Sequence, residues 1–474
     1  AADTVRRARE GIAAIEEGRL PATPEVYETL IKVCAAHAQT VLGAAVAMQY
    51  AMKYASCVSD PLMRRSYHSG ALLMANAVDV SPAEVYRRSL AYERLFADVR
   101  PYTHEGRRKK DKIRIGYISG DFREHVMQYF IWPFLAGFDR DDFEVYCYSL
   151  GRTDQYTEFF KTLVTAWRDV SKQANAPEKI AARIYADEVD ILFDLAGHTA
   201  RSGLPALAWK PAPVQLSGLG YMATTGLSAV DYFVTDRYCD PPGSVGDAYF
   251  VEKLLRLTSQ FCYNGYTQLP ASEGTPARRR GYILFGVFNQ YRKFTDEMLA
   301  VWREIMARVP ASRLLLKSQV FFAGEMRAAA EERLRRLGFD LGRVLLEPAD
   351  TGYMRRYLDV DIALDTFPWP GGGTTCDALY MGVPMVTRYA ARRSTRFGCA
   401  LLSHIGLAEL AAMGTEDYIA LAAALAGDLD TLDDLHRGLR GMMERSPLMD
   451  QKGYMRALED AYRRFAAVGS ERTV

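Results

Sequence analysis

The sequence predicts an α/β protein in which two Rossmann-like, doubly wound domains follow an all-helical region. Apolar residues recur at three- and four-residue spacing through the first part of the chain, as in amphipathic helices. Short β-rich runs then alternate with helical stretches, and this alternation, typical of βαβ units, occurs twice. With 474 residues the chain is too long for one core, so we expect three domains, at residues 1–105, 106–272 and 273–474.

The composition is that of an ordinary globular protein. Apolar residues make up 49% of the chain and charged residues 25%, and the net charge of +1 gives no reason to expect nucleic acid or a membrane as a partner. Seven widely spaced cysteines without a CxxC pair suit a reducing compartment and argue against a disulfide scaffold or a zinc site. Residues 1–20 lack the apolar stretch of a secretory signal, and no run of eighteen apolar residues occurs. We therefore expect a cytoplasmic protein.

Residues 1–105 are expected to form a helical cap or docking domain. Residues 26–55 are rich in alanine and carry apolar residues at helical spacing. Ser81 and Pro82 indicate the N-cap and first position of a later helix. Small residues are spaced somewhat as in tetratricopeptide pairs, but no 34-residue repeat is found. The basic stretch 103–112 that follows is expected to be a solvated linker.

Each Rossmann-like domain is predicted from five β-rich runs. In the first domain the runs lie at 112–119, 143–150, 190–197, 213–221 and 232–236. In the second domain they lie at 282–288, 313–318, 343–347, 360–367 and 383–387. Helical segments between them indicate parallel sheets, and ligands of such sheets bind at the carboxyl ends of the strands, here in a cleft between the domains. The last helix, at 451–468, is compatible with packing back across the first of these domains.

The stretch 370–387, PGGGTTCDALYMGVPMVT, places three glycines directly before a helix that we expect to begin near Thr375. Free N–H groups and the positive end of a helix dipole suit a phosphate, and Thr374 and Thr375 add hydroxyl donors. The stretch lacks the GK[ST] of a Walker loop and the spacing of GxGxxG. Taken alone, a tight strand-to-helix turn explains it equally well.

Two other strand ends carry candidate functional residues. Gln290 and Lys293 follow the strand at 282–288, where a lysine could meet a pyrophosphate as a point charge. Such a lysine is by itself more often a solvated surface residue, but the glycine loop at the same sheet edge favours the phosphate role. His125 follows the strand at 112–119, where it could act as a base.

Several alternatives and absences limit these interpretations. His125, His198 and His404 could each equally be structural histidines. The DVD at 359–361 resembles a strand edge more than a metal-phosphate site, and no His, Cys and carboxylate cluster has metal-ligand spacing. No GxSxG nucleophile elbow is present. We therefore expect no metal.

From about Lys112 onward the sequence resembles the O-linked N-acetylglucosamine transferase and SPINDLY family of GT-B glycosyltransferases, in the form of a bacterial member. The resemblance is carried by five blocks in the same order, RIGYISGDFREH, DILFDLAGHTARSGL, KPAPVQLSGLGYMATTG, FNQYRKFTDEMLAVWREIMARVPASRLLLK and GGGTTCDALYMGVPMVT. It implies a GT-B fold, with residues 106–272 on the acceptor side and 273–474 binding the nucleotide sugar.

The resemblance also implies roles for particular residues. Gln290 and Lys293 would contact the donor nucleotide and its diphosphate, and Asp377 its ribose. His125 lies where the family has a proposed base, so His125 and Lys293 are the catalytic candidates. The phosphates would be held by Gly372, Gly373, Thr374 and Thr375, and the sugar side would be lined by Leu219, Gly220, Tyr221 and Thr224.

The implied reaction is inverting, metal-independent transfer of a sugar to serine or threonine hydroxyls of a protein acceptor, with UDP-GlcNAc as the favoured donor and no cofactor. The sequence departs from the family at Val126 and Met222, where relatives often carry proline, and lacks the long repeat array. UDP-glucose, GDP-fucose and an asparagine acceptor stay open. So do a nucleotide-sugar epimerase and an inactive binding module.

Overall fold

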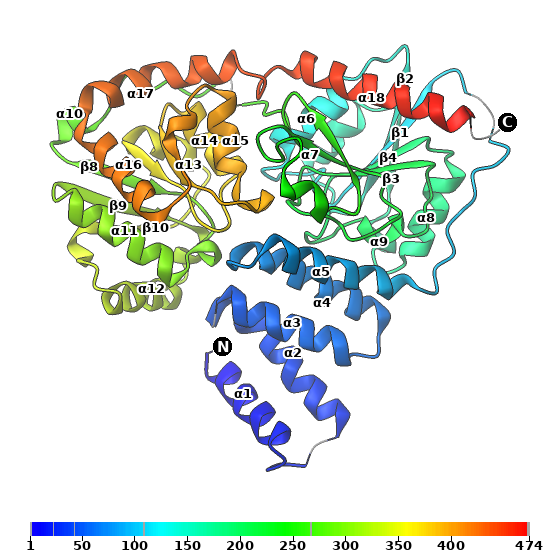
Figure 1. The fold of residues 1–474 in the computed structure, drawn as a ribbon, viewed down its shortest axis with the longest axis horizontal. Helices are drawn as coiled ribbons and strands as arrows, with labels where there is room; N and C mark the ends of the chain where they lie inside the picture. The colour runs from blue at the N-terminus through cyan, green and yellow to red at the C-terminus, as the bar shows by residue number, and fades with distance from the viewer. Residues whose placement is uncertain (1, 22, 42, 108–109, 266–267, 472–474) are drawn as a thin grey trace. The chain divides into compact units, whose positions relative to one another are not determined.

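The computed structural model describes residues 2–21, 23–41, 43–107, 110–265 and 268–471 (Figure 1). The chain forms two compact units, one of residues 1–264 together with 451–474 and the other of residues 265–450. Within the described part of the chain, no helix combines the length and apolarity needed to span a bilayer. The two units are therefore described one at a time.

The first unit begins with five helices, as the sequence predicts. These are α1 Ala2–Glu16, α2 Pro24–Val41, α3 Ala44–Cys57, α4 Pro61–Met74 and α5 Pro82–Glu93. The side chain of Ser81 accepts a hydrogen bond from Glu84 N and Pro82 occupies the first turn, so the predicted start of α5 is confirmed. Apolar side chains of successive helices share one core, which includes Ile12, Ile31 and Tyr54.

The first unit continues as a parallel sheet of seven strands in the order β3-β2-β1-β4-β5-β6-β7. Its strands are β1 Ile113–Ser119, β2 Phe143–Ser149, β3 Ala166–Asp169, β4 Ile191–Asp194, β5 Val214–Ser217, β6 Tyr232–Asp236 and β7 Lys253–Leu257. Its helices are α6 Gln128–Ala136, α7 Gln155–Lys161, α8 Pro177–Ala186 and α9 Leu204–Leu207. The five predicted strands are confirmed, and β3 and β7 are additional.

The last helix, α18 Gln451–Glu471, packs on this first sheet (Figure 1). Tyr454 and Tyr462 are buried in the same core as Tyr117 of β1. The packing of the last helix across the first Rossmann-like domain is therefore observed, although the sequence assigned these residues to the stretch 273–474.

The second unit contains a parallel sheet of six strands in the order β10-β9-β8-β11-β12-β13. Its strands are β8 Ile283–Val287, β9 Ser312–Lys317, β10 Val344–Glu347, β11 Ile362–Leu364, β12 Met385–Arg388 and β13 Ala411–Ala412. Its helices are α10 Ala277–Arg280, α11 Asp296–Arg308, α12 Gly324–Arg336, α13 Tyr353–Arg356, α14 Gly373–Tyr380, α15 Phe397–His404, α16 Thr415–Gly427 and α17 Leu429–Glu444. All five predicted strands are confirmed, so the predicted pair of doubly wound sheets is correct.

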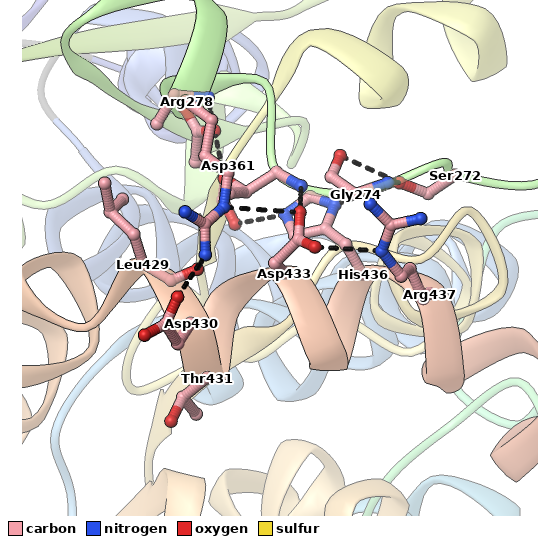
Figure 2. Close-up of polar contacts among 12 residues, drawn as sticks. Ser272, Gly274, Arg278, Asp361, Leu429, Asp430, Thr431, Asp433, His436 and Arg437 are labelled. Atoms are coloured by element: carbon pink, nitrogen blue, oxygen red, sulfur yellow. Dashed lines mark hydrogen bonds and ion pairs between the residues drawn. The ribbon is translucent and has the colours of Figure 1, made fainter.

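The segment that enters the second sheet is anchored by Asp361 (Figure 2). This buried carboxylate accepts hydrogen bonds from Thr275 Oγ1 and from the backbone N–H of Ala277, both at 2.7 Å. Asp433 of α17 accepts the N–H of Thr275 at 3.0 Å, so the same segment is also tied to a helix. Asp361 therefore has a structural role, in agreement with the strand-edge interpretation of the DVD sequence.

The basic stretch 103–112 is held against the first sheet over its described part; residues 108–109 lie outside the described residues. Lys110 Nζ lies 2.6 Å from Asp190 Oδ1, and Arg107 donates to the carbonyl oxygen of Val189 at 2.9 Å. The two basic side chains are only 14% and 15% exposed. For Lys110 and Arg107 the prediction of a solvated linker is therefore wrong, because both side chains satisfy groups at the start of β4.

Candidate active site

The glycine loop connects β11 to α14. Its first glycine, Gly371, is engaged in contacts within the protein. Helix α14 begins at Gly373, two positions before the predicted Thr375. The N–H of Gly371 donates to Asp365 Oδ1 at 2.8 Å and is thus already bonded. A Cβ at Gly371 would lie 2.3 Å from Thr374 Oγ1 and 2.7 Å from Thr375 Oγ1, so any other residue there would displace these two hydroxyls.

Lys293 meets this loop, as the strand-end argument predicts. It lies in the turn after β8, and its Nζ donates to the carbonyl oxygen of Pro370 at 2.9 Å. The ammonium group also lies 4.9 Å from the centre of the Trp369 ring. Burial lowers the pKa of Lys293 to about 8; Asp365 opposes this shift and Arg292 adds to it. A partly buried cation thus lies beside the start of a helix.

Asp365, the first residue beyond β11, completes this arrangement and was missed in the sequence. Its carboxylate is 1% exposed and accepts hydrogen bonds from Gly371 N and from Thr387 Oγ1, each at 2.8 Å. Burial raises its pKa, while these hydrogen bonds and the charge of Lys293 act in the opposite direction. A carboxylate between an apolar strand and a glycine loop was the available signal.

The other predicted donor residues of the second unit lie in α14, in the loop before it or in the turn that carries Lys293. Gln290 is exposed at the beginning of the turn that carries Lys293. Gly372, Gly373 and Thr374 are partly exposed, whereas Thr375 is buried and its hydroxyl donates to the carbonyl oxygen of Gly371 at 3.1 Å. Asp377 is buried and accepts the Tyr353 hydroxyl at 3.1 Å. Thr375 and Asp377 are thus bonded within the unit, and the donor-binding roles of all these residues stay predictions.

His125, in the first unit, follows β1 and is partly exposed. Its Nδ1 lies 3.5 Å from Asp121 Oδ1, and its side chain is 36% exposed. Burial lowers the pKa of His125, with Asp121 opposing and Arg123 reinforcing the shift. The imidazole is therefore mainly neutral at pH 7 and able to accept a proton.

The predicted sugar-side residues of the first unit divide into two pairs. Leu219 adopts a left-handed backbone conformation with φ 64°, and a Cβ at Gly220 would lie 2.6 Å from the Leu195 carbonyl oxygen, so this turn is strained and tight. The Tyr221 hydroxyl, in contrast, donates to Leu72 O at 3.4 Å. The Thr224 hydroxyl donates to Glu252 Oε2 at 2.6 Å. These two buried hydroxyls face the interior of the unit.

His198 is a structural histidine in this fold. Its Nδ1 lies 2.8 Å from Ser69 Oγ of α4, and its Nε2 lies 2.8 Å from the carbonyl oxygen of Thr225. Burial lowers the pKa of His198 to about 3. His198 therefore joins the helical region to the first sheet. His404 is the last residue of α15.

The described residues contain no group of three or more His, Cys, Asp or Glu side chains arranged to hold a metal ion. The absence of a metal or cofactor requirement in the reaction stays a prediction.

Comparisons with known proteins identify relatives of most of the chain. The family model described as glycosyl transferase family 41 matches residues 89–270 and 277–458. The probable UDP-N-acetylglucosamine–peptide N-acetylglucosaminyltransferase SPINDLY of Oryza sativa subsp. japonica is 39% identical over 358 residues, which are 74% of this chain and 38% of that protein. The corresponding probable enzyme SEC of Arabidopsis thaliana is 31% identical over 381 residues, 76% of this chain and 38% of its own.

A solved structure is similar over nearly the whole chain. A mutant of the O-GlcNAc transferase from Thermobaculum terrenum superimposes with a TM-score of 0.85 at 31% identity, covering 95% of this chain and 85% of that one. The chain spans only 38% of the length of the curated plant relatives named above. On the family match, the plant relatives and the shared GT-B fold, the chain belongs to glycosyl transferase family 41.

Proposed function

We propose that this protein transfers N-acetylglucosamine from UDP-GlcNAc to serine or threonine hydroxyls of a protein acceptor, with inversion and without a metal. The observation that carries the proposal is the position of Lys293, whose ammonium group donates to Pro370 O in the loop that leads into α14. A cation, backbone N–H groups and a helix dipole converge there, and together they suit a diphosphate. The names of the relatives support a UDP-GlcNAc donor and a peptide acceptor.

In the proposed reaction the acceptor oxygen attacks the anomeric carbon opposite the departing diphosphate. Negative charge develops on that leaving group, and Lys293 with the N–H groups at the start of α14 would stabilise it. A diphosphate near Lys293 would also favour the charged form of this lysine, whose pKa burial lowers to about 8. His125 would accept the proton of the acceptor hydroxyl, because its partly exposed imidazole is mainly neutral at pH 7.

The proposal is tested by incubating the protein with UDP-GlcNAc, UDP-glucose or GDP-fucose and a protein lysate. Intact-mass and fragment spectra then identify the sugar added and the residue that carries it. We expect N-acetylhexosamine on serine or threonine, at a rate unchanged by EDTA and strongly reduced by Lys293→Ala. Free sugar or an epimer formed without acceptor would identify a different reaction, and labelling only with another donor or on asparagine would correct the donor or the acceptor.

A further inference from the structure

The Pro370–Gly371 peptide is held at both of its ends by side chains of opposite charge. Lys293 Nζ donates to the carbonyl oxygen of Pro370 at 2.9 Å, and Asp365 Oδ1 accepts the N–H of Gly371 at 2.8 Å. The C=O and N–H of one trans peptide point in opposite directions. The ammonium and carboxylate groups therefore lie on opposite sides of a single peptide, and a flip of this peptide would break both hydrogen bonds.

Asp365 is itself held in place by several groups of the protein. Its Oδ2 accepts the hydroxyl of Thr387 at 2.8 Å, and its Oδ1 also accepts the N–H of Thr366 at 2.9 Å. A Cβ at Gly398 would lie 2.6 Å from Oδ2, so backbone of α15 covers the carboxylate directly. With 1% exposure, Asp365 is not placed to touch a ligand.

Lys293, in contrast, keeps donors available for a ligand. An ammonium group has three donors, and the described structure shows one of them on Pro370. A second cation lies close by, because the Arg292 guanidinium and the Lys293 ammonium lie 5.1 and 4.9 Å from the centre of the same Trp369 ring. Two like charges on one ring favour an anion between or beside them.

We propose that Asp365 is a positioning residue of the phosphate site: it fixes the Pro370–Gly371 peptide so that Lys293 is presented to a nucleoside diphosphate, without contacting that ligand itself. The inference rests on the proposed function for the identity of the ligand class. It goes beyond that function because it gives the buried Asp365 carboxylate a role: this carboxylate controls the charge and the position of Lys293.

The charge of Asp365 also affects the pKa of Lys293, and the direction of this effect can be stated. The charged groups that face Lys293 are Asp365 and Arg292; burial and Arg292 lower the pKa of Lys293, and Asp365 raises it. Without the charge of Asp365 the lysine would lose its proton at a lower pH. A diphosphate is bound by the charged lysine. When the pH is raised, a protein without the charge of Asp365 should therefore lose diphosphate binding earlier, at a lower pH than the wild type.

The first unit provides a matched control in Asp194. This carboxylate is 0% exposed, and its Oδ2 accepts Ser217 Oγ and Gly197 N, each at 2.8 Å, so its surroundings repeat those of Asp365. Among the described residues, burial raises the pKa of Asp194, and the groups that oppose this shift are Ser217, Gly197 and Ala196, none of which is a cation. Asp194→Asn and Asp365→Asn thus remove the same kind of buried charge, but only the second faces a cation.

The experiment is isothermal titration of UDP and UMP into the wild type and these two variants between about pH 6 and pH 9. We expect Asp365→Asn to weaken UDP binding about tenfold near pH 7.5 and to move the basic loss of binding about one pH unit lower, with a smaller effect on UMP. Asp194→Asn should lower the melting temperature and leave both binding profiles unchanged. Lys293→Met should remove the basic limb altogether.

A wild-type profile in folded Asp365→Asn, or an equal change in Asp194→Asn, would overturn the inference. If Asp365→Asn does not fold, Thr387→Val replaces it; loss of this hydroxyl favours the uncharged carboxyl, so a smaller shift in the same direction is expected, and no shift overturns the inference. UDP binding that depends on Asp365 in a protein that transfers no sugar would reject only the proposed function. Sugar transfer with normal binding in Asp365→Asn would reject only the positioning role, and a wild type that binds no nucleoside diphosphate would reject both.

Discussion

Asp194 ends β4 in the first unit, and Asp365 follows β11 in the second; both strands lie beside the first strand of their sheet. Each carboxylate accepts a hydroxyl from the next strand, Ser217 in one case and Thr387 in the other. Each also accepts the N–H of a glycine in the loop that follows. The two sheets thus build the same loop anchor at the edge where Rossmann-like sheets bind ligands.

The two loops differ in what reaches them next. In the first unit His198 follows the anchored glycine and is enclosed by Ser69, Thr225 and the ring of Tyr92, whose centre lies 4.7 Å from its own. In the second unit the loop leads into α14, and Lys293 approaches from the neighbouring turn. The anchor therefore fixes a turn in each unit; in the first unit the surrounding elements pack against it, and in the second they form the proposed phosphate site.

The turns after β1 and β8, the first strands of the two sheets, also place different side chains at corresponding positions. His125 comes six residues after Ser119, the end of β1, and Lys293 comes six residues after Val287, the end of β8. One position carries a partly exposed imidazole beside Asp121, and the other carries an ammonium group on a peptide carbonyl. Equivalent positions thus carry the proposed base in one unit and the proposed leaving-group cation in the other.

The largest effect is expected from Lys293→Ala. One preorganised charge donor is typically worth about 3 to 4 kcal/mol in the transition state, so kcat should fall roughly 10²- to 10³-fold. Turnover of the nucleotide sugar at saturating donor measures this effect. The control is Lys317→Ala at the end of β9, because Lys317 is 4% exposed and bonded to Pro348 O and Asp350; it should lower stability and spare kcat. Near-normal turnover in folded Lys293→Ala would contradict the role of the loop.

The two anchored glycines should respond differently to alanine. At Gly197 a Cβ would lie 2.3 Å from Tyr221 Cβ, and φ is 56°, so Gly197→Ala should cost about 3 kcal/mol of folding free energy. At Gly371 the nearest atoms are threonine hydroxyls, so Gly371→Ala should keep more stability and weaken UDP binding about tenfold. Urea unfolding and UDP titration measure the two effects. Equal losses of stability with unchanged UDP binding would mean that both loops are purely structural.

His198 should make the first unit sensitive to acid. Its pKa is about 3 in the folded protein against about 6.5 when unfolded, so the neutral histidine contributes fully above pH 6.5 and this stability is lost as the pH falls towards 3. At pH 5 the loss should be about 2 kcal/mol. His198→Gln, which cannot titrate, should be less stable at pH 7 but show a shallower acid slope in urea unfolding. An unchanged slope would assign the acid sensitivity to other groups.

Most of the fold could be predicted because its central strands are buried apolar runs. The strands that were not predicted show where such runs become too weak to recognise. β3, β7 and β13 all lie at sheet edges; β3 has the sequence AWRD and β7 KLLRL, and both are only partly buried. An edge strand buries less of its surface, so its apolar pattern is weaker. β10, an edge strand of sequence VLLE, was predicted because its apolar run is longer than that of β3.

In the site, neighbouring strand ends were enough to predict that Lys293 meets the glycine loop. The position of Asp365 after an apolar strand was a usable signal, but its hydrogen-bond partner Thr387 was not predictable, because it lies 22 residues away in the sequence. The hydroxyl directions of Tyr221 and Thr224 depend on Leu72 and Glu252 in the same way. Sequence pattern identified the edge of the sheet, whereas the partners of each buried polar group are set by tertiary packing.

The smallest effect is expected from His125→Ala, about a tenfold loss of kcat/KM near pH 7, because the imidazole is partly exposed and water or a donor phosphate can take the proton instead. The pH profile discriminates better than the rate. With its pKa lowered by burial, His125 should set an acid limb below pH 6.5, and Lys293 a basic limb near pH 8. His125→Ala should remove the acid limb and keep the basic one, whereas Asp121→Asn, which removes the charge that raises the pKa of His125, should move the acid limb lower. If the acid limb stays in place in His125→Ala, the turns after β1 and β8 are alike only in the positions of these residues, and the proton leaves through a group other than His125.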